Sequence, residues 1–463
     1  MSDLPLSVQI DAWPGQPAFG PLAGDAQNWG SRTGLPPSQA GLAFTKPADP
    51  TDWEHDDVGY GILLPDTPDK QWSKEKVTGA NAPEPVRRLL AARPKTQLLY
   101  WNAELKNVYV RRYFDDGTSS DPLIGLTTFG IARNRLPMYV LIVGCPERIP
   151  WSVQYSLSLR HAVGRLPFED DADLASYVDA MLDGDHGWAS TPTDVTSPVV
   201  WTVDRGATDI TRLMRTVFSA PLVKAFSGTL AGLRTLDDAA ATGTGFTQAV
   251  TAAQPAVVVT SSHGATPLDQ QQLSASLGLP IDATDTTVPL ADLAGSLPAG
   301  CVWFAQACCS AGSAADSSYI QLLEEGSTAR LVVDAVATLG STVAPAPLAL
   351  LKRPHPVRAV FGHVEPTFDW TLRDGETHQR LANDLVTGLS ENLHYGQPLG
   401  FILAAYRQGI GVLTTNWVGT NERLKRDHDI SVLPALTRLR LTAWDRQSLV
   451  LLGDPTVRIP PLP

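Results

Sequence analysis

The chain has 463 residues, with 36 Lys and Arg against 48 Asp and Glu, so its formal net charge at pH 7 is −12. This length allows roughly two or three domains with buried cores, and a hydrophobic content of 43% argues against bulk disorder. An acidic balance gives no electrostatic footprint for nucleic acid. No apolar stretch is long enough to cross a membrane, and the start resembles no secretory signal. We therefore expect a cytoplasmic protein with neither nucleic acid nor membrane as its partner.

The cysteines argue against a disulfide-stabilised protein and against a metalloprotein. There are only four, at positions 145, 301, 308 and 309, and two of them are adjacent. This number is too small for a disulfide framework, so we expect at least one free thiol. No CxxC pair and no HExxH motif is present, so the sequence predicts no bound metal.

Residues 1–85 are rich in Gly, Pro, Asp and Trp and show little periodicity. We expect an irregular N-terminal arm. Two roles remain open for it: an inhibitory or partner-docking segment, or an added layer of the neighbouring subdomain.

Periodic segments begin after this arm. Residues 86–185 alternate apolar, β-rich runs with helical patterns, and we expect an N-terminal α/β subdomain there. The predicted strands are 96–103, 136–144 and 161–168, and the predicted helices are 86–93 and 169–182. A Gly/Ser/Thr/Pro-rich break at 183–197 is the predicted domain boundary.

The same alternation resumes over residues 196–463. The predicted strands there are 197–204, 255–262, 300–307, 331–342, 437–445 and 448–460, and the predicted helices are 207–218, 246–254, 381–393 and 399–413. Unbroken apolar strands that alternate with helices are typical of a mostly parallel sheet covered by helices on both faces. The sequence therefore predicts an α/β fold.

Two of these strands lead into residues that carry chemistry. One runs directly into His263 and Gly264, and the other into Cys308 and Cys309. Sites in open α/β sheets form beyond the carboxyl ends of the strands, so these residues can meet. A thiolate is a nucleophile, and a nearby imidazole activates it or protonates the leaving amine. Either residue alone is more commonly structural, but together they predict a Cys–His catalytic pair.

The context of this pair resembles known families. Gln306-Ala307-Cys308 after an apolar strand, with a His-Gly pair upstream, resembles the caspase signature, although the Gly is delayed to position 312. The run Ala-Cys-Cys-Ser-Ala at 307–311 is similar to the pattern of the bacterial caspase-like CHAT proteases.

Three further motifs resemble the gingipain-type (C25-like) cysteine peptidases of the same clan, CD. They are LPMYVLIVG at 136–144, HAVGRLPF at 161–168 and SLVLLGDPTVRIP at 448–460, in the same order as in that group. The resemblance covers about residues 96–460. It implies a caspase/gingipain-like three-layer α/β/α sandwich with two tandem subdomains, the second of which, 196–463, is catalytic.

The resemblance also implies roles for residues. His263 matches the catalytic His and Cys308 the nucleophile, whereas a metacaspase-like alignment would choose Cys309. The backbone N–H groups of Gly264 and Cys308 would form the oxyanion hole. The implied activity is peptide-bond hydrolysis that requires no cofactor, with structural calcium allowed.

The biological role of the predicted activity is inferred by analogy with these families. A member of this clan in the cytoplasm resembles a regulated endopeptidase with a protein or peptide substrate and an activating protein partner, as in bacterial defence or cell death. The alternative is a catalytically inactive caspase-like scaffold that binds a protein partner, which the doubled cysteine and the displaced Gly keep open.

Four charged residues are candidates for finer roles. Glu147, on the turn after a predicted strand, is a candidate for the acid that orients the His, and its ordinary explanation is an exposed loop carboxylate. Asp316 and Asp334 are placed to face a basic P1 side chain, while Arg330 could face an acidic one. Each of the two Asp residues has the ordinary explanation of a helix cap or a solvated carboxylate. We lean toward cleavage after Arg or Lys.

The remaining features indicate ordinary structure. His355 and His363 are eight positions apart without neighbouring Cys or acidic residues, so we expect a surface loop there and no metal site. The Trp residues are scattered, which is typical of core and interface packing.

Overall fold

The computed structural model describes residues 48–67, 71–168, 170–183, 187–191, 193–374 and 377–462. It also describes the backbone of two short strands, β1 (Ser7–Ile10) and β2 (Ala18–Pro21), which pair antiparallel. The chain divides into two compact units, residues 1–47 and 48–463. Most of the first unit, and with it much of the predicted arm, lies outside the described residues. In the described part, no helix is both long and apolar enough to cross a bilayer.

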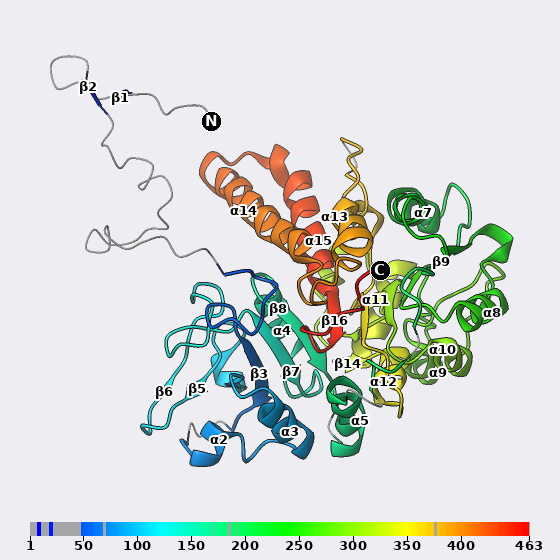
Figure 1. Cartoon of the computed structure of the whole chain (residues 1–463). Helices are drawn as coiled ribbons and strands as arrows, with labels where there is room; N and C mark the ends of the chain where they lie inside the picture. Colours follow the sequence, from blue (N-terminus) through cyan, green and yellow to red (C-terminus); the bar gives the residue numbers. More distant parts are fainter. Residues whose placement is uncertain are drawn as a thin grey trace. The chain divides into compact units, whose positions relative to one another are not determined.

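A ten-stranded sheet forms the centre of the second unit (Figure 1). The strands, in spatial order, are β10 (Arg234–Leu236), β9 (Val199–Thr202), β11 (Val257–Ser261), β12 (Val302–Gln306), β15 (Ala359–His363), β16 (Leu449–Gly453), β8 (Ala162–Leu166), β7 (Tyr139–Val143), β3 (Tyr60–Pro65) and β4 (Gln97–Trp101). Short pairs β5 (Arg112–Tyr113) with β6 (Ser119–Ser120), and β13 (Gly312–Ser313) with β14 (Thr342–Val343), lie outside it. The central strands are buried along their whole length, which explains their unbroken apolar sequences.

The sheet consists of two parallel blocks. Neighbouring strands are parallel throughout except at β15 and β16, which are antiparallel. β16 is then parallel to β8 and continues into the second block. The carboxyl ends of the two blocks therefore lie at opposite edges of the sheet.

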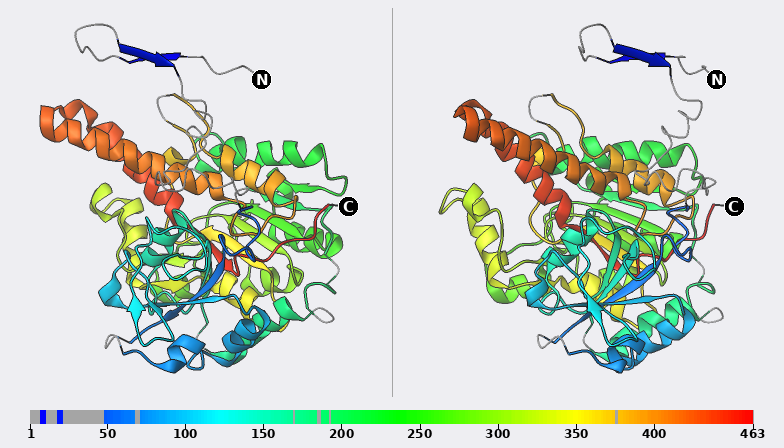
Figure 2. Two further views of the ribbon diagram at one scale, coloured as in Figure 1. Left: turned by 60° about the vertical axis from the view of Figure 1, so that its left-hand side comes forward. Right: turned by 90° about the vertical axis from the view of Figure 1, so that its left-hand side faces the viewer.

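Helices cover both faces of the sheet (Figures 1 and 2). One layer consists of helices that contact one another in the order α3 (Glu84–Ala92), α5 (Asp171–Leu182), α12 (Pro345–Lys352), α10 (Leu290–Ser296) and α8 (Gly243–Ala253). The other layer contains α6 (Ile210–Met214), the π-helical turns η3 (Arg215–Ser219) and η7 (Gly388–Asn392), α7 (Ala220–Ser227), α13 (Asn383–Thr387), α14 (Ala404–Asp427), α15 (Leu433–Ser448) and α4 (Trp151–Ser158). The predicted three-layer α/β/α fold is confirmed.

Other helices are α2 (Lys74–Thr78), α9 (Gln270–Ser276) and α11 (Thr328–Thr338), with 3₁₀ turns η2 (Ala103–Leu105), η4 (Asp238–Ala240), η5 (Ile320–Leu322), η6 (Asp369–Thr371) and η8 (Ile430–Val432). Helices α14 and α15 pack on each other as a hairpin that projects from the body of the unit in Figure 2.

Two predicted strands are helices. Residues 331–342 lie mostly in α11, where Val333 and Val336 share the buried face and Ser327 caps the N-terminus. Residues 437–445 lie in α15. Local β-branched content and an alternation of Thr, Arg and Leu indicated strands there, but packing against neighbouring helices outweighs those local preferences.

Two predictions of irregular structure are also wrong. Residues 60–65, assigned to the irregular arm, form β3 between β7 and β4. His363, assigned to a surface loop, ends the buried strand β15, and its Nδ1 lies 3.0 Å from Ser448 Oγ. Both strands contain a Gly, which is uncommon in strands and interrupts their apolar runs. The division into subdomains 86–185 and 196–463 stays a prediction, and β16 of the second pairs with β8 of the first.

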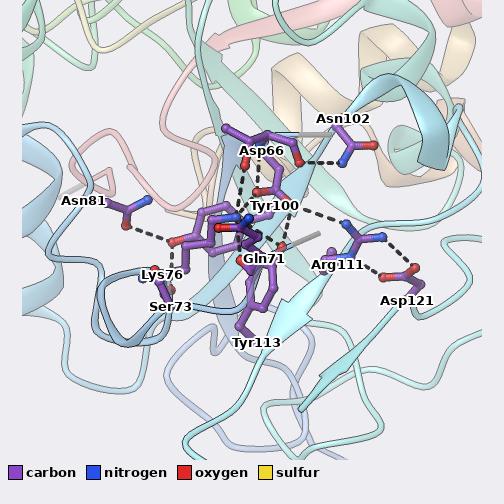
Figure 3. A network of polar contacts seen from close by, with 11 residues as sticks. Asp66, Gln71, Ser73, Lys76, Asn81, Tyr100, Asn102, Arg111, Tyr113 and Asp121 are labelled. Atoms are coloured by element: carbon purple, nitrogen blue, oxygen red, sulfur yellow. Dashed lines mark hydrogen bonds and ion pairs between the residues drawn. The ribbon is translucent and has the colours of Figure 1, made fainter. Parts of the chain in front are cut away.

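Buried polar networks connect distant segments of this fold. Asp66 accepts hydrogen bonds from Tyr113 Oη at 2.8 Å and lies 2.8 Å from Lys76 Nζ, while Arg111 pairs with Asp121 at 2.8 Å (Figure 3). Each buried charge in this network thus has a partner of opposite charge.

Asp454, in the Leu-Gly-Asp-Pro motif, is the centre of a second buried polar network. Its carboxylate is fully buried, accepts a hydrogen bond from Tyr60 Oη at 2.6 Å and from the Thr456 N–H at 2.8 Å, and lies 3.4 Å from Arg93 Nη1. Its own N–H donates to Tyr177 Oη at 2.7 Å. Through its carboxylate and its N–H, Asp454 therefore connects β3, the end of α3 and α5 to the segment after β16.

We predict that Asp454→Ala lowers the free energy of unfolding by about 3 kcal/mol, because it leaves a buried Arg and a buried phenol without their acceptor. Urea unfolding measures the change. Asp179→Ala is the control, since its ion pair with Arg88 is exposed and contributes at most about 1 kcal/mol. Equal losses in the two variants would contradict this role of Asp454.

Candidate active site

The predicted Cys and His follow two neighbouring parallel strands. β11 pairs with β12 in a register that sets Ser261 opposite Gln306, and the Ser262 N–H donates to the Gln306 carbonyl at 3.2 Å. His263 and Cys308 each lie two residues beyond their strand. The pairing therefore delivers both residues to one edge of the sheet.

The two strand-end loops touch at Gly264. A Cβ atom on this residue would lie 2.0 Å from the Cys308 carbonyl oxygen, so only Gly fits the close approach. In the described part of the chain, neither the Gly264 nor the Cys308 N–H donates a hydrogen bond, whereas the next residue in each loop does: Ala265 to Leu279 O and Cys309 to Glu365 O. Two unengaged donors thus lie side by side.

The two adjacent cysteines differ in environment. Cys309 is 0% exposed, packs among Leu273, Leu277 and Val336, and has a left-handed backbone with φ of 56°. Cys308 is half-buried. Burial raises the pKa of both thiols, that of Cys309 well above its ordinary value. Of the two residues, Cys308 alone is partly exposed.

The Cys308 sulfur contacts the loop that follows β15. The Thr367 N–H donates to Sγ at 3.3 Å, and Thr367 Oγ1 lies 3.8 Å from it. Burial raises the pKa of this thiol, and the Thr367 N–H opposes that effect. Between the described side chains of Cys308 and His263 there is no hydrogen bond.

His263 is held by an acid that the sequence analysis missed. Its Nε2 lies 3.0 and 3.1 Å from the two carboxylate oxygens of Asp209. Asp209 is the N-cap of α6, which follows the neighbouring strand β9, and it accepts hydrogen bonds from the Thr211 N–H at 2.9 Å and Thr211 Oγ1 at 2.6 Å. Burial raises the pKa of Asp209, but the bonds from Thr211 and His263 outweigh it and leave that pKa lowered.

This contact determines the proton arrangement of the ring. An ionised carboxylate only accepts hydrogen bonds, so Nε2 carries the hydrogen and Nδ1 of the neutral ring has the lone pair. The signal in the sequence was the Asp-Ile-Thr that begins a helix just after a buried strand at the same edge.

Glu147, the predicted orienting acid, is in the wrong place. It follows β7, which belongs to the other parallel block, with β12, β15, β16 and β8 between β7 and β11. Its edge of the sheet is the one opposite His263. Glu147 is exposed, as its ordinary explanation states.

In the described part of the chain, no hydrogen bond or ion pair joins the predicted specificity residues to the Cys308 thiol. Asp316 is exposed in the loop after β13. Asp334 pairs with Arg330 one turn earlier on α11 at 2.9 Å, and Arg330 also donates to the Ile320 carbonyl. Arg330 and Asp334 therefore satisfy each other on a helix surface.

Two buried acids near the thiol were also missed. Glu365 follows β15, and Asp445 lies near the end of α15. Burial raises the pKa of each to about 7. Glu365 repeats the pattern of His263, two residues beyond a buried strand, whereas Asp445 lies in a segment mistaken for a strand.

The described residues include no group of three or more His, Cys, Asp or Glu side chains that could hold a metal ion.

The chain is similar to several solved structures at low sequence identity. No protein-family model and no curated sequence matches the chain. A complex of the pro- and mature domains of Porphyromonas gingivalis RgpB is 11% identical, with 87% of this chain and 80% of that chain covered and a TM-score of 0.45. The Arg-specific cysteine proteinase gingipain R is 13% identical, with 88% and 80% covered and a TM-score of 0.44. A structure described as a protease is 10% identical, with 86% and 78% covered and a TM-score of 0.47.

We predict that iodoacetamide alkylates Cys308 at least tenfold faster than Cys309 or Cys301 in the folded protein at pH 8, because the latter two are fully buried. Peptide mapping by mass spectrometry measures the three rates. Faster labelling of Cys309 would contradict the assignment of Cys308 as the accessible thiol.

The buried acids predict a pH dependence of stability. The pKa of each acid is about 7 in the folded state, whereas that of an unfolded carboxyl is ~4. At a pH between these two pKa values, the folded state therefore binds more protons than the unfolded state. Their contribution to stability is therefore present below about pH 4 and is lost as the pH rises through 7. Urea unfolding at pH 5 and pH 8 measures the free energy of unfolding at each pH. Between these two values it should fall less in the double variant Glu365→Gln, Asp445→Asn than in the wild type. An equal fall of the free energy of unfolding in both proteins would contradict the raised pKa of these two acids.

Proposed function

We propose that the chain is a caspase-like cysteine peptidase that hydrolyses peptide bonds with Cys308 as nucleophile and His263 as acid and base. The observation that carries this proposal is the placement of both residues beyond neighbouring parallel strands, with His263 held by Asp209. All three fall within 196–463, the predicted catalytic subdomain.

The first chemical step is acylation. Cys308 Sγ turns from Thr367 toward His263, a change of side-chain rotamer, and gives its proton to Nδ1. The thiolate attacks the scissile carbonyl carbon, and the Gly264 and Cys308 N–H groups stabilise the resulting oxyanion. His263 then gives the proton to the leaving amine as the C–N bond breaks.

The second step is hydrolysis of the thioester. His263 Nδ1 takes a proton from water, the hydroxide oxygen bonds to the acyl carbon, and the thiol leaves with the proton from His263. The Asp209 carboxylate acts as a positioning residue, since it fixes the ring orientation and stabilises the imidazolium in both steps.

The proposed substrate is a protein or peptide, with a preference for Arg or Lys at P1. We further propose that another polypeptide regulates the enzyme, as in a bacterial defence or cell-death pathway. The contact of the Cys308 sulfur with Thr367 supports regulation, because the thiol must leave this contact before it can act.

The same contact favours a second candidate, a catalytically inactive scaffold. A thiol with a raised pKa that is bonded to Thr367 and not to His263 is a poor nucleophile. The two candidates differ in one measurable property, the reaction of Cys308 with a substrate carbonyl.

We predict that the protein cleaves members of a fluorogenic peptide library and that Cys308→Ala and His263→Ala abolish cleavage. Asp209→Asn should lower kcat by about 100-fold or more, because the ring loses its orienting charge. Cys309→Ala should retain cleavage, since that thiol lies in a separate apolar cluster.

Controls separate a resting enzyme from a scaffold. Peptidyl electrophiles should label Cys308 in the wild type and much more slowly in His263→Ala. Absence of both cleavage and labelling would overturn the proposal in favour of the scaffold.

A further inference from the structure

A groove of about 430 Å³ lies where the hairpin of α14 and α15 meets α4 (Figure 1). Its walls are mostly helix faces, because the lining residues of each helix recur at spacings of three and four. The large side chains that line it are Tyr155, Leu159, Trp417, Arg440, Trp444 and Gln447. Its volume lies in the range of protein cavities that bind ligands. Three helices thus form a cavity that is open before any partner arrives.

Exposed apolar side chains surround this groove. Leu159, which lines it at the end of α4, is 37% exposed. Val108 and Tyr109, directly after a lining residue of the loop that follows η2, are 39% and 41% exposed. Val418, next to Trp417 on α14, is 45% exposed. A single exposed apolar residue is ordinary, but several around one groove are typical of a surface that a partner covers.

The charge of the groove indicates the chemistry of that partner. Among the described residues that line it, only Arg440 is charged, and this exposed guanidinium has no ion-pair partner there. The whole chain has a net charge of −12, so a groove with a cation and no acid differs from the average surface. A guanidinium binds a carboxylate through two parallel hydrogen bonds. The groove therefore suits a polypeptide segment with a large apolar side chain close to an Asp or Glu.

One wall of the groove is connected to the candidate active site by packing. Trp444 and Phe368 both pack against the apolar cluster around Tyr319. The Tyr319 and Phe368 rings meet edge to face, with 4.8 Å between their centroids. Phe368 is adjacent to Thr367, whose N–H donates to Cys308 Sγ at 3.3 Å. The position of the Trp444 ring therefore affects the loop that holds the thiol.

Tyr155 provides a second connection from the groove to the same loop. Its side chain lines the groove, whereas its phenol oxygen is buried in the interior. The phenol interacts electrostatically with Glu365 and Cys309. The Glu365 carbonyl accepts a hydrogen bond from the Cys309 N–H at 3.2 Å. Both connections thus end at the loop 364–368.

We propose that this groove is the docking site of a regulatory protein partner, which places an apolar side chain against Trp417 and Trp444 and pairs a carboxylate with Arg440. This inference rests on the proposed peptidase activity and names the surface through which another polypeptide controls it. The inserted side chain displaces the Trp444 ring, the loop 364–368 loses that support, and Thr367 releases the Cys308 sulfur. Docking and release of the thiol are coupled because the partner binds better to the released state.

The coupling is tested first without a partner. Trp444→Ala removes the ring that supports the loop, so iodoacetamide should alkylate Cys308 about fivefold faster or more than in the wild type. Trp72→Ala is the matched control, since this exposed Trp does not line the groove, and it should leave the rate unchanged. Cys301 is fully buried and should stay unlabelled, because only general unfolding exposes it. Where Trp444→Ala exposes Cys301, the smaller change Trp444→Leu takes its place.

The partner chemistry is tested with a display library of short random peptides, selected on Cys308→Ala protein so that none is cleaved. We expect the selected peptides to combine Trp, Phe or Leu with Asp or Glu. By fluorescence polarisation, Arg440→Glu and Trp417→Ala should each weaken their binding about tenfold or more, whereas Trp72→Ala should not. Such a peptide should also raise the alkylation rate of Cys308 in the wild type about fivefold or more.

Several results would overturn the inference. They are an unchanged rate in the Trp444 variant, selection of basic peptides or of none, and binding that the groove variants do not affect. Peptides that bind the groove without a change in alkylation would overturn its regulatory role. A dimer of the wild type that Arg440→Glu dissociates would assign the groove to a second copy of the chain. Because alkylation requires no catalysis, each of these results differs from failure of the peptidase proposal, which is absence of cleavage and of labelling by peptidyl electrophiles.

Discussion

The parallel pairing of β11 with β12 is the constraint on which the site depends. It brings two chain segments that are far apart in sequence to the same edge of the sheet in register, so that His263 and Cys308 leave their strands at the same level. The contact of Gly264 with the Cys308 carbonyl then fixes the distance between the two loops. A shift of one residue in this pairing would turn the side chains to the other face and separate the pair.

The carboxyl groups around the site have two different electrostatic environments. Asp209 is partly exposed, ionised and held by Thr211, so it provides a fixed negative charge next to the imidazole. Glu365 and Asp445 are buried, and burial raises the pKa of each to about 7, although the charge of Arg446 opposes this effect at Asp445. The first arrangement supports proton transfer, whereas the second favours the protonated form of both acids.

Much of the fold could be predicted because fully buried parallel strands have unbroken apolar sequences. The strands before His263 and Cys308 largely have this property, and so does β7. Segments whose state depends on tertiary contacts could not be predicted: α11 and α15 have strand-like local composition but become helices by packing. Asp209 was visible only as a helix cap, since its distance from His263 depends on the order of strands in the sheet.

The reversal of direction between β15 and β16 explains how Asp445 comes to lie near Glu365 and the Cys308 thiol. In a uniformly parallel sheet, residues that precede a strand lie at the edge away from the active site, so only strand-end loops can line it. Because β16 runs the other way, the helix that leads into it arrives at the same edge where β15 ends, and His363 pairs with Leu449. The last strand of the chain thus allows a rigid helix, and not a loop alone, to supply one wall of the site.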